Sequence, residues 1–173
     1  MVDLIKSVLN GREWQTAVAS ASVVSFESKV LDMCKLNYCG QYGTRWTCPP
    51  GTGSLEKIVE ELSRYKNIFV FTTKHSIEDS FDIEGMMEAR KLHDEIQSDV
   101  KKALAGKDVK ILGVGGCSLC EKCTYPSSPC RFPDRVTPAM EACGINVVTL
   151  SATLGINYIN GANTVTYFSA IFY

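Results

Sequence analysis

Four cysteines fall within the short segment GVGGCSLCEKCTYPSSPCRFP, which spans residues 113–133. Cys117, Cys120 and Cys123 follow one another at two-residue gaps, and Cys130 comes next. Thiols this close together are typical of a disulfide knot, a zinc site or an iron–sulfur cluster. Each of these would fix the path of the chain around it, so this segment constrains the fold more strongly than any other.

Composition argues against the disulfide knot. The chain has 173 residues, of which 45% are hydrophobic and 21% charged, and its formal net charge is −1. The N-terminal segment lacks the apolar run of a secretion signal, and no run of ~18 apolar residues indicates a membrane span. We expect one cytoplasmic domain over residues 1–173, with reduced thiols. The balanced charge predicts no nucleic-acid or membrane partner.

The spacing of the four cysteines favours iron–sulfur over zinc. Four-cysteine zinc sites use two C-x2-C pairs separated by a long loop. A C-x2-C-x2-C run followed by a more distant cysteine is the ligand pattern of ferredoxin-type clusters. A cubane separates its irons, so each successive turn of the chain can reach a different iron. The segment predicts a [4Fe–4S] cluster held by Cys117, Cys120, Cys123 and Cys130, with zinc as the alternative.

A second cysteine group, CKLNYCGQYGTRWTCPP, contains Cys34, Cys39 and Cys48. Its spacing is too loose for a zinc knuckle, and its glycines allow close approach to a bulky centre. Three thiolates would leave one iron of a cluster open to water, substrate or another ligand. Tyr42 and Trp46 are expected to shield this cluster from solvent.

Cys143 stands alone, and two interpretations of it stay open. As a fourth ligand it would complete the second group and give two closed metal sites. As a small apolar residue on a short helix it would belong to the core, where free cysteines are common. Cys130 has a similar ambiguity, because the last cysteine of such a run ligates the other cluster in two-cluster ferredoxins.

Polar residues near the cysteines are further candidates. Arg131 directly follows a candidate ligand and is expected to offset the negative charge of a cluster. Arg45 and Arg135 are interpreted as surface arginines, although a guanidinium here could also hold an anionic substrate or a redox partner. Glu141 is a candidate proton donor at an open iron, and His93 is expected to belong to the scaffold.

Hydrophobic periodicity predicts an α/β fold, with α+β as the alternative. We expect a mixed sheet sandwiched with helices, two cysteine-rich metal loops and a first crossover that forms a right-handed β-α-β unit. The C-terminal strand suits burial in the core or edge pairing in a homodimer. The predicted helices are 54–65, 83–106 and 137–144, and the predicted strands are 67–75, 109–116, 145–150 and 164–173. Segment 16–26 could form either a strand or a helix.

Two segments together resemble a widespread, mostly prokaryotic family of predicted metal-binding proteins of unknown function. They are CGQYGTRWTCPP and GGCSLCEKCTYPSSPCRFPDRVTPAMEACGINV. The resemblance extends from about Cys34 onward. It implies an iron–sulfur protein of anaerobic metabolism rather than a zinc protein, and it implies no particular reaction.

The sequence therefore predicts an electron-transfer protein with one or two [4Fe–4S] clusters. Its partner would be a redox protein or a small molecule. One alternative is an enzyme that uses the open iron of a three-cysteine cluster as a Lewis acid. Another is an interaction module whose fold is stabilised by zinc.

Overall fold

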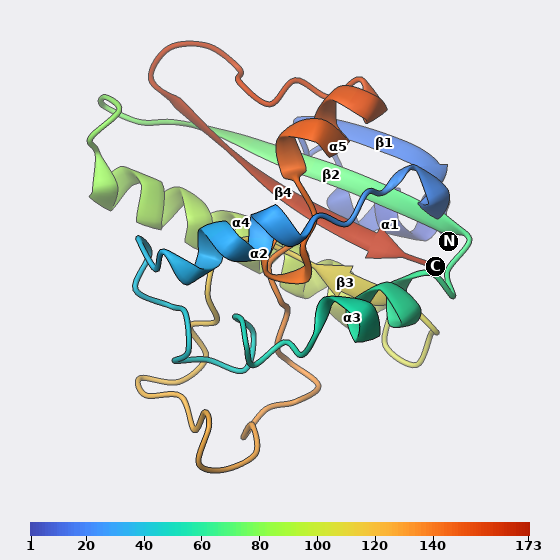
Figure 1. Ribbon diagram of the computed structural model, residues 1–173. Coiled ribbons are helices and arrows are strands. Elements are labelled where there is room, and N and C mark those ends of the chain that lie inside the picture. Colours follow the sequence, from blue (N-terminus) through green and yellow to red (C-terminus); the bar gives the residue numbers. More distant parts are fainter.

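The computed structural model describes residues 1–173 and contains a four-stranded sheet (Figure 1). Every pair of neighbouring strands is antiparallel. The predicted combination of helices and a sheet is confirmed, but the sheet is antiparallel rather than mixed, as in the α+β alternative. The strands lie in the order β1 (Gln15–Ser20), β2 (Asn67–Ser76), β4 (Thr164–Phe172) and β3 (Lys110–Leu112).

The C-terminal strand β4 lies inside the sheet, between β2 and β3. Both neighbours run antiparallel to β4 and hence parallel to each other. The predicted β-α-β unit is therefore split, because β4 is inserted between its two parallel strands. β3 pairs only with Ala170–Phe172, so the rest of β4 is paired on the β2 side alone, and edge pairing in a homodimer stays a prediction.

Alternating side chains of β2 build two separate cores. Ile68 and Val70 face one side of the sheet, while Phe69 and Phe71 face the other. This alternation follows from the two-residue period of a strand. Because both faces are apolar, each needs a cover of helices.

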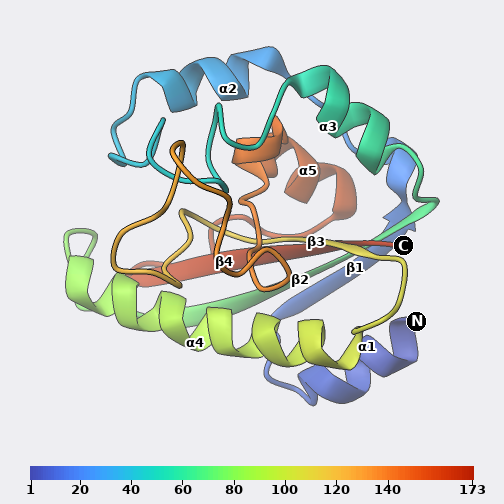
Figure 2. The ribbon, with the colours of Figure 1, turned by 90° about the horizontal axis from the view of Figure 1, so that it is seen from below.

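Helices cover both faces of the sheet (Figure 2). One face is covered by α1 (Val2–Leu9) and α4 (Ile83–Ala103), whose apolar residues pack on the two phenylalanines of β2. The other face is covered by α3 (Leu55–Leu62) and α5 (Val147–Leu154), and α2 (Ser28–Lys35) lies on the same side.

The two longest predicted helices are confirmed, and each begins at a side-chain cap. The Ser54 hydroxyl accepts the Lys57 N–H at the start of α3. The Asp82 carboxylate caps α4 by accepting the Gly85 N–H at 2.7 Å. Gly106 adopts a φ of 76° just after α4, a left-handed conformation that glycine adopts without strain.

The predicted strand over 145–150 is wrong, because this segment forms the start of α5. Asn146 caps the helix by accepting the Thr149 N–H at 3.2 Å, and Gly155 ends it with a φ of 67°. Val147 and Leu150 are buried at helical spacing. The six residues INVVTL have strand composition, so only the flanking cap and stop residues signal the helix.

The predicted helix over 137–144 is also wrong, since only one 3-10 turn forms there, η2 (Glu141–Cys143). The residues before it run extended, because Gly113 donates to the Pro138 carbonyl at 2.8 Å and accepts from the Met140 N–H at 3.1 Å. Segment 16–26, which fitted either type, forms β1 and a 3-10 turn, η1 (Ala21–Val23).

The two cysteine-rich segments lie side by side, beyond the edge strand β3. In Figures 1 and 2, the long connections after α2 and after β3 gather in the same region of the molecule. None of the helices combines the length and the apolarity that crossing a bilayer requires.

A buried polar network joins α4 to the sheet. His93 is fully buried, and its ring nitrogens contact the Thr73 and Ser169 hydroxyls, each at 2.8 Å. Ser169 also accepts the Gln97 side-chain amide at 2.6 Å. Burial lowers the pKa of His93 to about 3, and the charge of nearby His75 adds to this effect. His93 is therefore the neutral scaffold residue that the sequence predicts.

The depressed pKa of His93 predicts an acid-sensitive fold. The unfolded histidine has a pKa of about 6.5, so below that pH the unfolded state binds a proton that the folded state does not. The His93 contribution to the free energy of unfolding should fall by about 1.4 kcal/mol per pH unit between about pH 6 and pH 4. Urea unfolding of the wild type and of His93→Gln over this range measures it. Parallel pH profiles for the two proteins would contradict the assignment.

Candidate metal centre

The four cysteines of the loop after β3 line one small cavity. The loop leaves the sheet at Gly113 and returns at Ala139, and these two residues pair as an isolated bridge. Because both ends are fixed, the loop must fold back on itself. This brings together the thiols of Cys117, Cys120, Cys123 and Cys130.

Backbone N–H groups and a cation surround these thiols. The Phe132 N–H donates to Cys130 Sγ at 3.4 Å. Burial acts to raise the pKa of Cys123, but N–H groups of Tyr125, Trp46 and Thr124 and the charge of the Arg45 guanidinium outweigh it and lower that pKa. These donors favour the thiolate, which is the form that ligates metals.

Segment 45–47, from the other cysteine group, binds this loop directly. The Arg45 guanidinium donates to the Cys117 carbonyl, and the Thr47 hydroxyl accepts the Cys117 N–H at 3.2 Å. Trp46 Nε1 donates to the Ser128 carbonyl at 3.1 Å. The Trp46 ring also packs edge-on against Tyr125, with ring centroids 4.9 Å apart. Trp46 therefore lies at the four-cysteine loop and not, as predicted, at the group of three.

The group of three cysteines converges where α2 ends. Cys34 lies in the last turn of α2, Cys39 is exposed in the following turn, and Cys48 is buried. Burial raises the pKa of Cys34, and the charges of Cys39 and Glu141 raise it further. These mutual effects place the three thiols within electrostatic reach of one another. Tyr42 lies in the same connection, where its N–H donates to the Asn37 side chain at 3.0 Å.

One guanidinium acts on both cysteine groups. Burial raises the pKa of Cys48, while the Thr47 hydroxyl and Arg45 oppose that rise. Arg45 also lowers the pKa of Cys123 in the other group. Arg45 therefore lies between the two candidate metal sites. From the sequence, Arg45 is expected to be a surface arginine, and its position three residues before Cys48 gives only a weak signal.

Cys143 lies in the apolar core. Cys143 is only 4% exposed, and it packs among the core residues on the α3 and α5 side of the sheet. Burial raises its pKa to about 12. The same 3-10 turn packs against α2 and brings Glu141 within electrostatic reach of Cys34. Burial raises the pKa of Glu141 as well.

Arg131 lies at the wall of the four-cysteine cavity. Its guanidinium donates to the Lys122 carbonyl at 2.9 Å and so holds two parts of the loop together. The position is compatible with the predicted role of offsetting negative charge. The side chain is exposed on its outer side.

The donor set suits a thiolate-bound metal group. Thiols, N–H donors and guanidinium groups are the environment in which such a group is held and tuned. No three His, Cys, Asp or Glu side chains are arranged to hold a single ion. The cavity holds about 20 Å³, which is room for about one water. A four-iron cluster is larger than this cavity, so the loop would have to open to hold one.

Comparisons with known proteins point to metal binding. A family model described as a predicted metal-binding protein matches residues 17–173. The search of curated proteins found no match. Among solved structures, the chain is similar to epoxyqueuosine reductase from Bacillus subtilis, with 11% sequence identity and a TM-score of 0.40. That alignment covers 98% of this chain and 44% of the other, so the chain spans less than half of the length of that protein.

The burial of Cys143 predicts that metal binding does not require it. Cys143→Ala should keep the full metal content of the protein and lose only about 1 kcal/mol of stability, because one buried sulfur is removed. Cys123→Ala is the matched control and should lose metal. Elemental analysis of both anaerobically purified variants measures this. A folded Cys143→Ala protein with reduced metal content would make Cys143 a ligand.

Proposed function

The chain belongs to the DUF2284 family of predicted metal-binding proteins, and we propose that it is an iron–sulfur protein that carries electrons. It binds one or two [4Fe–4S] clusters. Cys117, Cys120, Cys123 and Cys130 ligate the first, and Cys34, Cys39 and Cys48 ligate the second.

The observation that carries the proposal is the shared cavity of four thiols. They come from a C-x2-C-x2-C run and one later cysteine, the ligand order of ferredoxin-type clusters.

The adjacency of the two cysteine groups supports electron transfer. Segment 45–48 contributes Cys48 to one group, while its neighbours Arg45 and Thr47 bind the loop of the other. Two clusters held this way would lie close together and share one cation. Electrons could then pass between a partner at one cluster and a partner at the other.

The chain's own residues would tune the clusters. When bound, a [4Fe–4S] cluster supplies one-electron redox chemistry. Arg45, Arg131 and the backbone N–H groups of the loop offset its negative charge, which stabilises the reduced state. Trp46 and Tyr125 cover part of the loop and limit the access of water. We propose a cytoplasmic location, because reduced thiols are available there.

A second candidate function is catalysis at an open iron. It is favoured by the group of three cysteines, because the charge of Glu141 acts on Cys34. A cluster with three thiolates leaves one iron free to bind a substrate as a Lewis acid. Glu141, whose pKa is raised by burial, is placed to hold a proton there.

Anaerobic purification tests the proposal. We expect a brown protein with iron and sulfide in equal amounts, about four or about eight of each per chain, as expected for one or two [4Fe–4S] clusters. Iron, sulfide and zinc analysis with visible absorption and EPR measures this. A colourless, folded protein with stoichiometric zinc would contradict it. Cys123→Ala should lose one cluster's share of iron, and His93→Gln, which lies away from the cysteines, should lose none.

Arg45→Gln should lower the reduction potential of the protein. Removing a cation from beside a negatively charged cluster destabilises the reduced state, and the expected shift is on the order of tens of millivolts for one electron. Arg64→Gln, which changes an exposed arginine just after α3, is the matched control. EPR-monitored redox titration measures both. Equal potentials in all three proteins would remove Arg45 from the electrostatics of the clusters.

A further inference from the structure

A polar groove lies on the outer side of the four-cysteine loop. It has a volume of about 610 Å³ and runs between one face of α4 and the loop. Cys117, Leu119 and Val136 line both this groove and the cysteine cavity. These three residues therefore form a wall shared by the groove and the cysteine cavity.

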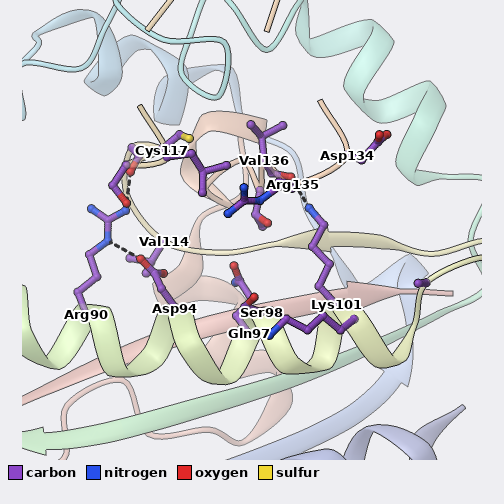
Figure 3. Close-up of a pocket in the computed structure, with 16 residues that line it drawn as sticks. Arg90, Asp94, Gln97, Ser98, Lys101, Val114, Cys117, Asp134, Arg135 and Val136 are labelled. Carbon is purple, nitrogen blue, oxygen red and sulfur yellow. Dashed lines mark hydrogen bonds and ion pairs between the residues drawn. The ribbon is translucent and has the colours of Figure 1, made fainter. Parts of the chain in front are cut away.

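Cationic side chains frame the groove from both sides (Figure 3). Arg90 rises from the first half of α4 and Lys101 from its last turn, and Arg135 enters from the loop opposite. Lys102 adds a fourth cation, against the two acidic residues Asp94 and Asp134. The positive excess favours an anionic ligand.

Arg90 is partly buried and has donor capacity left. Its Nη2 donates to the Gly116 carbonyl, which fixes the guanidinium against the loop. Its Nε lies 3.5 Å from the Asp94 carboxylate but makes no hydrogen bond, although the atom is buried. Because Nε is enclosed and already ion-paired with Asp94, the donors left for a ligand are those of Nη1, which makes no hydrogen bond.

Lys101 and Arg135 are held in place with most of their donors free. Lys101 Nζ donates to the Val136 carbonyl at 2.7 Å, which uses one of its three N–H groups. The Arg135 guanidinium stacks over the Phe132 ring, 5.2 Å from its centroid, and has no hydrogen-bond or ion-pair partner. Ser98 adds an exposed hydroxyl on the α4 side of the groove.

We propose that this groove binds a small molecule through its carboxylate or phosphate group. Arg90, Lys101 and Arg135 hold the oxyanion, since guanidinium groups match the geometry of both groups with paired N–H donors. The rest of the ligand lies along the wall that Leu119 and Val136 share with the cysteine cavity. The site depends only on these side chains and goes beyond the electron-transfer proposal.

Titration calorimetry on the anaerobically purified full chain tests this, with inorganic phosphate and succinate as separate probes. Sodium chloride at matched ionic strength corrects for screening. Arg135→Gln removes a free guanidinium, and Ser98→Glu places a negative charge on the α4 side. Each should weaken binding of the preferred probe by ~10-fold, the size of one charge-assisted hydrogen bond. Arg64→Gln, an exposed arginine outside the groove, should leave the affinity unchanged.

The outcomes separate cleanly. Saturable binding of phosphate alone assigns a phosphate-bearing ligand, and binding of succinate alone assigns a carboxylate. Heats no larger than those of sodium chloride, or equal weakening by Arg64→Gln and Arg135→Gln, would overturn the proposal. Iron analysis of the same samples keeps the two proposals apart, because a failure of anion binding leaves the iron content untouched.

Discussion

Two hydrogen bonds at Gly113 hold the four-cysteine loop to the sheet. Through them the chain leaves β3, forms the loop and returns beside its starting point to enter the core at Met140. A Cβ at this position would meet the side-chain amide of Gln97 of α4, so a larger residue would have to displace that amide from its hydrogen bond with Ser169. The positions of the four thiols, of η2 and of α5 all follow from this closure.

The second structural requirement is the segment from Arg45 to Cys48. It places a thiol in one cysteine group and a guanidinium, an indole and a hydroxyl against the other. The two groups are far apart in sequence, yet this short segment makes them neighbours. A change in one group would therefore be transmitted to the other through a shared charge and shared hydrogen bonds.

Local signals in the sequence predicted the elements that have them. The capped helices α3 and α4 and the β-branched strand β2 formed as expected, because cap, period and composition agree in each. The strand predicted over residues 145–150 is wrong because their composition favours a strand, whereas the caps Asn146 and Gly155 favour a helix. The sheet order could not be predicted, since insertion of β4 between β2 and β3 depends on packing of both sheet faces.

In the candidate site, too, local features could be predicted from the sequence and long-range contacts could not. Spacing alone grouped the cysteines, and the structure gathers the four of the loop around one cavity and places Cys143 in the core. Spacing could not show that Trp46 would turn toward the loop after β3, because that contact joins residues 82 apart in sequence. Nothing in the sequence indicated a role for Arg90 at the site, because its contact with Gly116 exists only once α4 lies against the loop.

One face of helix α4 packs in the core, and the opposite face lines the groove. Ile96 and Val100 pack into the core, while Ser98 and Lys101 line the groove. Substitutions on the outer face leave the packing against the sheet intact. Exposed groove positions such as Ser98 and Lys102 could therefore change the ligand preference of the groove, while Arg90 and Lys101 continue to hold the cysteine loop. A single scaffold of this kind could serve relatives with different small molecules.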